Sequence, residues 1–233
     1  MDSNIKIFWL GQAGLYFEVL GKKILVDPYL SDSVERINPL NYRRVPVEEK
    51  FLKVKPDIIV LTHNHLDHTD PETLKHYLEN GSQVLVLASG NAWVEVRKFG
   101  GKHNYVCFNR HTRWTECTED GSEICFTAVY AEHSDSHAVG VIIEAEGKIF
   151  YITGDTLYNN RIFKDLPDDI YAVFLPINGV GNNMNMYDAK KFAKKSGAKK
   201  VVPVHFGLFD EVDPNDFADD NVVIPKIYEE IGL

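Results

Sequence analysis

Short apolar runs separated by polar turns recur along most of the chain, and this pattern predicts a protein rich in β-strands. The first third contains three such runs, at residues 5–10, 15–20 and 23–26. The Gly21-Lys22 pair between the last two runs predicts a tight turn, so these runs are expected to form a hairpin. A loop that starts at Asp27 follows the hairpin.

The same order of elements recurs farther along the chain. A second predicted hairpin, 139–145 and 148–153, turns near Glu146-Gly147 and again ends in an aspartate, Asp155. Each half continues with an apolar run, a helix that ends at a glycine, and another strand. In the first half these are residues 57–61, a helix that ends at Gly81, and 83–88. In the second half they are residues 170–175, a helix that ends at Gly197, and 199–204. Two β-rich halves with flanking helices predict an α/β (α+β) fold, a four-layer αββα sandwich with two internally similar halves.

Composition limits the classes of protein that fit this sequence. The chain has 233 residues, of which 44% are hydrophobic, and this favours one globular domain over residues 1–233. No apolar run approaches the ~20 residues that cross a bilayer, and the start lacks the features of a signal peptide, so we expect a cytoplasmic protein without a membrane partner. A net charge of −9 argues against nucleic acid as a partner. Three cysteines without C-x-x-C spacing indicate neither disulfides nor a cysteine-rich zinc site.

Residues 62–68, Thr-His-Asn-His-Leu-Asp-His, place four metal-ligand side chains within six residues, directly behind an apolar run. Successive side chains of an extended segment alternate in direction, so His63 and His65 point the same way and can bind one ion. Asp67 and His68 then face a second ion. The alternative is a polar surface loop.

A helix is predicted directly after this motif. Asp70 suits the N-cap, Pro71 the first helical position and Glu72 the first turn, and Gly81 is the expected stop. The motif therefore lies on a loop between a strand and a helix.

Three further candidate ligands lie just beyond predicted strands. These are His133 after 123–130, Asp155 after 148–153 and His205 after 199–204. Strand ends that converge on one edge would bring them together. As alternatives, Asp155 is a turn residue and His205 a core histidine, and His137 is a rival to His133.

The H-x-H-x-D-H pattern after a buried strand resembles the metallo-β-lactamase superfamily of hydrolases. Other segments are similar, in order, to the subgroup that contains L-ascorbate-6-phosphate lactonase, namely 9–14, 27–32, 131–135, 153–158, 176–179 and 203–207. The resemblance spans nearly the whole chain. It implies the αββα fold and a metal-dependent hydrolase.

The resemblance also implies how the ligands divide between two ions. One ion would take His63, His65 and His133, the other Asp67, His68 and His205, with Asp155 bridging. One or two divalent ions per chain are expected, zinc or manganese, because histidine suits zinc and carboxylates are compatible with manganese. Such an ion lowers the pKa of its water to ~7, so hydroxide is the expected nucleophile. Asp155 would hold the ions and Asp67 would orient the water, which makes these two aspartates the catalytic candidates.

Candidate substrate contacts lie in two irregular segments. Arg43 and Arg44 belong to 31–50, which lacks clear periodicity and is expected to be an ordered loop over the site. Their guanidinium groups can bind phosphate or carboxylate, so a small anionic molecule is the expected partner, with a solvated loop as the alternative. Asn178 and Asn183 offer amides to a hydroxylated substrate, although a turn-rich loop has the same composition.

The resemblance implies that metal-bound hydroxide opens the lactone of a phosphorylated sugar acid. Phosphodiester or amide hydrolysis is the alternative, because the same metal pair can stabilise either transition state. A non-enzymatic metal-binding scaffold is a third hypothesis. Flavodiiron-type redox chemistry is not indicated, because those relatives have Glu where His65 stands and normally need a flavin domain. The sequence leaves the oligomeric state open, and a homo-oligomer is compatible with it.

Overall fold

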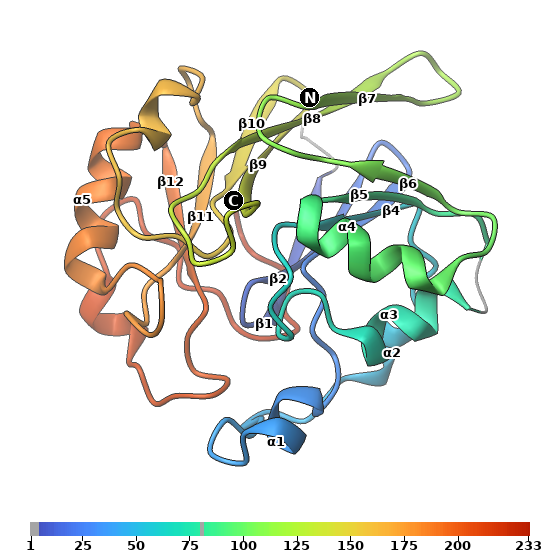
Figure 1. The fold of residues 1–233 in the computed structure, drawn as a ribbon. Helices are drawn as coiled ribbons and strands as arrows, with labels where there is room; N and C mark the ends of the chain where they lie inside the picture. The colour runs from blue at the N-terminus through green and yellow to red at the C-terminus, as the bar shows by residue number, and fades with distance from the viewer. Residues whose placement is uncertain (1–4, 80–81) are drawn as a thin grey trace.

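Two six-stranded sheets form the centre of the molecule in the computed structural model, which describes residues 5–79 and 82–233 (Figure 1). The first sheet has the strand order β1 (Lys6–Gly11), β2 (Gly14–Val19), β3 (Lys22–Val26), β4 (Ile58–Leu61), β5 (Leu85–Ala88) and β6 (Asn104–Cys107). The second has the order β12 (Lys200–Val204), β11 (Ala172–Pro176), β10 (Lys148–Ile152), β9 (Val139–Ala145), β8 (Glu123–Tyr130) and β7 (Arg113–Cys117).

Helices cover the outer face of each sheet. The described helices are α1 (Ser33–Ile37), α2 (Glu49–Leu52), α3 (Pro71–Leu78), α4 (Gly90–Val96) and α5 (Met186–Ser196), with short 3-10 turns η1 (Arg97–Phe99), η2 (Ile162–Lys164) and η3 (Pro214–Phe217). Figure 1 shows α3 and α4 over the first sheet and α5 beside the second. The layers run helix, sheet, sheet, helix, which confirms the predicted αββα sandwich. None of the described helices is long and apolar enough to cross a membrane.

Aromatic side chains join the two sheets across the core. Phe17 on β2 meets Phe150 on β10 and Phe174 on β11, with ring centroids 5.8 and 6.0 Å apart and the rings nearly edge to face. Such pairs are worth about 0.5–1.5 kcal/mol beyond the burial of their area. They belong to a cluster of buried side chains drawn from both sheets. The core therefore fixes the spacing of the sheets and the positions of their strand ends.

The two halves share their connections, as predicted. β2 and β3 form an antiparallel hairpin, and β4 and β5 then continue the sheet in parallel. β9 and β10 form the equivalent hairpin, followed by the parallel strands β11 and β12.

Both predicted hairpins are present, but one turn is shifted. Glu146 and Gly147 form the second turn, with φ of 50° and 71°. The first turn consists of Leu20 and Gly21, with φ of 50° and 73°, because Lys22 is already paired as the first residue of β3. Positive φ at both central residues matches the twist of the flanking strands.

The predicted helix signals agree with the helices that follow them. The Asp70 side chain accepts hydrogen bonds from the backbone of Glu72 and Thr73, which caps α3. Its expected stop at Gly81 lies outside the described residues, and the last residue of α3 is Leu78. At the end of α5, Gly197 has a left-handed φ of 68°, as a C-terminal glycine should.

The sequence pattern missed five elements: α1, α2, α4, β6 and β7. The segment 31–50, expected to be irregular throughout, contains α1 and begins α2. These helices have five and four residues, which is too short for a helical period to show. β6 and β7 are sheet edges with mostly exposed or half-buried side chains, so they lack the apolar run by which the other strands were found.

Candidate metal centre

The candidate ligands all follow strand ends. The motif 63–68 follows β4, His133 follows β8, Asp155 follows β10 and His205 follows β12. In the second sheet, β8, β10 and β12 run in one direction. β8 and β10 are both antiparallel to β9, and β10, β11 and β12 are parallel to one another. Strands of equal direction end at the same edge of a sheet. Residues far apart in the sequence therefore become neighbours.

Three imidazoles and one carboxylate form what we call the first cluster. The ring centroids of His63, His65 and His133 lie between 4.6 and 4.8 Å apart. With Asp155, their candidate ligand atoms all lie within 4.8 Å of one another. His65 Nδ1 and His133 Nε2 are 3.2 Å apart. Nitrogen atoms thus converge on one point from three directions.

The second cluster consists of Asp67, His68 and His205, whose candidate ligand atoms also lie within 4.8 Å of one another. Asp67 Oδ2 is 3.3 Å from His205 Nε2. Asp155 of the first cluster reaches this one too, with Oδ1 3.2 Å from His68 Nε2 and Oδ2 3.3 Å from His205 Nε2. The structure therefore brings together all seven predicted ligands, with Asp155 between the clusters.

Buried ligand atoms without partners indicate that these residues fit a metal ion. Within the described residues, His63 Nε2 is buried and makes no hydrogen bond, and His68 Nε2 and Asp155 Oδ1 are buried with only their contact of 3.2 Å to each other. An unsatisfied buried polar atom costs about 1–3 kcal/mol, so such poorly satisfied atoms in one place need an explanation. Bound cations would satisfy them, and five imidazoles with two carboxylates suit a borderline divalent ion.

The electrostatics of the site divide the histidines. Burial lowers the pKa of His63 well below its usual value, aided by the neighbouring His68, so its ring stays neutral. Burial opposes charge on His205 too, but the carboxylates of Asp155 and Asp67 outweigh it and raise its pKa to about 10. For His68, the same carboxylates and Asp27 outweigh burial and raise the pKa. Protons on His68 and His205 therefore balance the negative charge of the carboxylates, and a bound metal ion would replace these protons.

Burial alone would raise the pKa values of both cluster aspartates. His205 and His68 outweigh burial at Asp155 and hold its pKa well below the usual range. At Asp67 the same two histidines lower the pKa. Both side chains are therefore carboxylates, the form that binds a cation.

Asp27 is a supporting residue to which the sequence assigned no role. Its Oδ2 accepts a hydrogen bond from His68 Nδ1 at 2.8 Å and one from Thr62 Oγ1 at 2.5 Å, and its Oδ1 accepts one from the Thr62 backbone at 2.8 Å. Asp27, His63 and His68 form a third close group, but the nitrogen that faces Asp27 already donates to it. Asp27 therefore leaves His68 Nε2 free for an ion. The internal repeat could have indicated a role for Asp27, because Asp27 follows the first hairpin as Asp155 follows the second.

Two amide side chains hold the cluster carboxylates. Gln12 Nε2 donates to Asp67 Oδ2 at 3.1 Å, and Asn183 Nδ2 donates to Asp155 Oδ2 at 2.9 Å. Asn178 Nδ2 lies 3.1 Å from His205 Nδ1. Asn178 and Asn183 were expected to bind substrate, but their amide groups contact metal-ligand candidates instead. Both nevertheless line the pocket over the clusters.

The arginines expected to bind an anionic substrate are not among the described residues that line this pocket. Arg43 donates to the backbone oxygens of Tyr29 and Val45 and to Tyr228 Oη, which commits its guanidinium to the loop. Arg44 stacks on Tyr42, with its Nη2 atom 3.7 Å from Glu211 and its Nη1 atom buried without a partner in the described chain. Neither arginine lines the pocket. Their role in substrate binding therefore stays a prediction.

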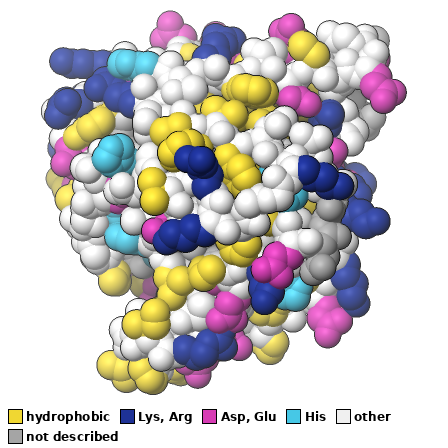
Figure 2. Space-filling view, turned by 45° about the vertical axis from the view of Figure 1, so that its right-hand side comes forward, with side chains coloured by type: hydrophobic (Ala, Val, Ile, Leu, Met, Phe, Trp, Pro, Cys, Tyr) yellow, Lys and Arg dark blue, Asp and Glu magenta, His cyan; other side chains and the backbone are white. Residues whose placement is uncertain are grey.

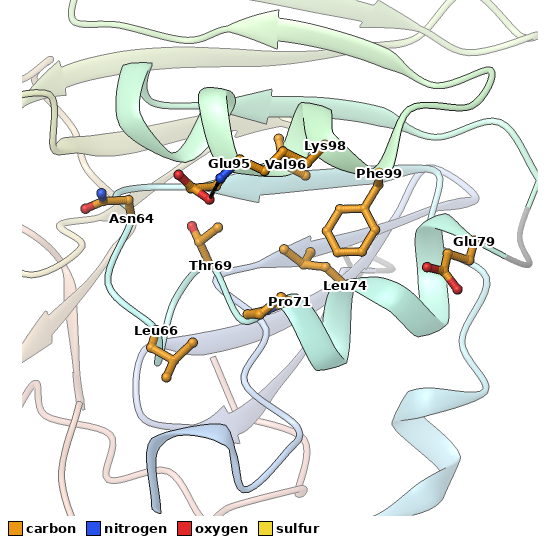
Figure 3. Close-up of a pocket in the computed structure, with 10 residues that line it drawn as sticks. All are labelled: Asn64, Leu66, Thr69, Pro71, Leu74, Glu79, Glu95, Val96, Lys98 and Phe99. Atoms are coloured by element: carbon orange, nitrogen blue, oxygen red, sulfur yellow. Dashed lines mark hydrogen bonds and ion pairs between the residues drawn. The ribbon is translucent and has the colours of Figure 1, made fainter. Parts of the chain in front are cut away.

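Two cavities adjoin the motif, and only one contains the ligands. A pocket of about 390 Å³ is lined by His65, Asp67, His133, Asp155 and His205, together with residues of α1 and of four loop segments. A larger cavity of about 470 Å³ lies between α3 and η1, where Leu74 and Phe99 point into it (Figure 3). None of the candidate ligands is among the described residues that line the larger cavity. The smaller pocket is therefore the candidate reaction site.

Known proteins share this sequence and this architecture. A family model described as a beta-lactamase superfamily domain matches residues 22–206. A UPF0173 metal-dependent hydrolase of Ligilactobacillus salivarius is 31% identical over 229 residues, covering 91% of each chain. One from Anoxybacillus flavithermus is 30% identical over 229 residues, covering 91% of this chain and 92% of the relative. The chain therefore belongs to the beta-lactamase superfamily and, within it, to the UPF0173 metal-dependent hydrolases.

A solved structure shares the fold over nearly the whole chain. The metallo hydrolase of the archaeon Ignicoccus hospitalis superimposes with a TM-score of 0.72 and 24% identity, covering 97% of each chain. The names of these relatives specify a metal-dependent hydrolase and no substrate. The likeness to a lactonase subgroup therefore stays a prediction.

We predict that His65→Ala and Asp155→Ala weaken metal binding by more than the roughly 10- to 100-fold that loss of a supporting partner costs. Both remove a ligand atom from the first cluster. Metal titration by calorimetry measures the effect, and circular dichroism checks the fold. His76→Ala is the control, because His76 lies on the exposed face of α3. Unchanged affinity in both ligand variants would contradict the assignment.

His133 rather than His137 should bind metal. His133 belongs to the first cluster, whereas the His137 ring lies against Gly90 and its Nδ1 faces Ser136 Oγ. Elemental analysis of His133→Ala and His137→Ala should show metal loss only in the first variant. Loss only in the second would reverse the choice.

Asp27→Asn should weaken metal binding about 10- to 100-fold while the protein stays folded. An amide facing His68 Nδ1 favours the tautomer that carries its proton on Nε2, the atom needed for the ion. Competition with a chromogenic chelator measures this affinity. Asp57→Asn is the matched control, because Asp57 also accepts a backbone hydrogen bond, from Lys23, but lies outside the clusters. Equal affinities in the two variants would show that Asp27 has only a structural role.

Proposed function

We propose that this metal-dependent hydrolase cleaves an ester bond, with a lactone as the first substrate class, and that it uses two divalent ions, zinc or manganese. The position of Asp155 carries the proposal. It belongs to the first cluster, and its oxygens also lie 3.2 and 3.3 Å from histidine nitrogens of the second. One carboxylate shared by two ligand groups suits a pair of ions that act on one bond.

Metal ions bound here would polarise the scissile carbonyl and make a water molecule nucleophilic near neutral pH. Asp67 is the candidate residue for orienting that water and accepting its proton. Its side chain is 18% exposed, compared with 7% for Asp155. Gln12 occupies Oδ2 of Asp67, so Oδ1 is the atom available to accept a proton.

The pocket wall supplies neutral groups that can orient a substrate. Asn41 and Asn182 line the pocket, and their side-chain amides make no hydrogen bond within the described residues. Each offers a donor and an acceptor to a carbonyl or hydroxyl group. The likeness of the motifs to the lactonase subgroup supports a lactone, whereas the phosphate of the sugar acid that the resemblance implies would meet no lysine or arginine among the described residues that line the pocket.

The protein stripped with a chelator and refilled with zinc or manganese should hydrolyse δ-valerolactone or a 4-nitrophenyl ester. The stripped protein should fall to the background rate, because the carbonyl then lacks its electrophilic partner. A pH-stat assay follows the lactone, and absorbance follows 4-nitrophenolate.

Bis(4-nitrophenyl) phosphate and a 4-nitroanilide serve as comparison substrates. Faster cleavage of either than of the esters would replace ester hydrolysis by the phosphodiester or amide alternative. Metal binding without hydrolysis of any of these substrates would favour the scaffold hypothesis.

A further inference from the structure

We infer that the site selects an uncharged substrate with an apolar group, and this inference rests on the proposed ester hydrolysis. It concerns the walls of the 390 Å³ pocket rather than the metal clusters at its base. The resemblance instead led to the expectation of an anionic substrate. Charge and polarity of the wall decide between these two classes.

The wall provides no counter-charge for an anion. Of the described residues that line the pocket, none is a lysine or an arginine. Three aspartates line it, and two divalent ions would more than offset Asp67 and Asp155, so selection by charge falls to the wall beyond the clusters. Asp210 remains, and its Oδ1 accepts hydrogen bonds from the backbone of Gly207 and Val212 at 2.7 and 3.1 Å. No cation pairs with Asp210 within the described chain, so an anionic substrate group that lies against this part of the wall would be repelled.

The two arginines expected to bind an anion make contacts outside the pocket lining, and one donor of Arg44, Nη1, has no hydrogen-bond partner within the described chain. All three hydrogen bonds of the Arg43 guanidinium go to the loop and to Tyr228. The Arg44 guanidinium stacks 4.8 Å above the Tyr42 ring and faces Glu211. An anionic substrate would have to break these contacts before it gained a cation, and burying an unpaired anion is costly.

Apolar side chains enter the pocket from three separate segments. Val34 comes from α1, Val180 from the loop after β11, and Phe209 from the loop after β12. Val180 is 61% exposed, so an apolar substrate group would cover surface that water now contacts.

The apolar surface continues outward along the segment that carries Val34. Ile37 and Leu40 are 77% and 81% exposed. Figure 1 shows α1 projecting from the body of the molecule, and Figure 2 shows hydrophobic side chains gathered on this projection. Asn41 and Asn182 add neutral polar groups to the wall, so the pocket suits a neutral ester with an alkyl or aryl part.

Two matched esters test the charge preference. 4-Nitrophenyl hexanoate and mono-4-nitrophenyl adipate differ only in a terminal methyl group against a carboxylate. The metal-loaded protein should show kcat/KM about tenfold higher for the hexanoate, which corresponds to about 1.4 kcal/mol. Shortening the neutral acyl chain should lower kcat/KM by up to about fourfold for each methylene that the wall buries. Equal or higher kcat/KM for the adipate would overturn the inference.

A charge introduced at the wall should change this preference. Val180→Lys should lower the ratio of hexanoate to adipate kcat/KM by about three- to tenfold, because it supplies the missing cation. Val94→Lys is the matched control, since Val94 is 53% exposed on α4 and does not line the pocket. An equal change in both variants would show that overall charge, and not the pocket wall, sets the ratio.

Arg44→Ala tests the competing source of positive charge. If this arginine reads an anion despite its contacts, the variant should lose adipate hydrolysis selectively, and that result would also overturn the inference. Equal kinetics of Arg44→Ala and the unaltered protein on the adipate would support it.

A binding measurement separates this inference from the proposed function. Hexananilide and adipanilic acid are neutral and anionic amides of matched size, and calorimetry with the metal-loaded protein compares their Kd values. Tighter binding of the neutral amide without hydrolysis of any ester would reject ester hydrolysis and keep the charge preference. Tighter binding of adipanilic acid would reject the charge preference, whatever the esters show.

Discussion

The buried carboxylate of Asp155 is the constraint on which the rest of the site depends. A buried anion is costly unless several partners face it, and here imidazoles from β4 and β12 stand 3.2 and 3.3 Å away. The two imidazoles are those of His68 and His205, which follow strands of different sheets. The two sheets must therefore end at the same place, and the aromatic contacts between Phe17 on β2 and the second sheet hold that spacing.

Because of the internal repeat, His68 contacts one aspartate from each half. Asp27 and Asp155 end equivalent hairpins, and they face opposite nitrogens of the same ring. Asp27 accepts a hydrogen bond from His68 Nδ1 at 2.8 Å, while an oxygen of Asp155 lies 3.2 Å from His68 Nε2. One aspartate thus fixes the tautomer, and the other shares the metal site. Equivalent residues of two similar halves have acquired different functions because only one ring lies between them.

The sequence was most informative where local pattern and chemistry coincide. The H-x-H-x-D-H motif and the strand ends could be read from spacing, and the structure brings their side chains together. The supporting contacts of Gln12 and Asn183 could not, because they join loops far apart in the chain. The contacts of the adjacent arginines were likewise not visible in the sequence. Sequence shows that Arg43 is charged, but only the fold shows that its donors are used by the backbone and by Tyr228.

Rigid and variable parts of the site have separate origins. The ligands sit at or near the ends of strands that are paired and buried, so their geometry depends on the core. The pocket wall comes from α1 and from the loops after β11 and β12, which supply Val34, Val180 and Phe209. Loops tolerate substitution better than the strands they connect. Relatives that are about 30% identical can therefore keep the hydrolytic chemistry while their walls accept different substrates.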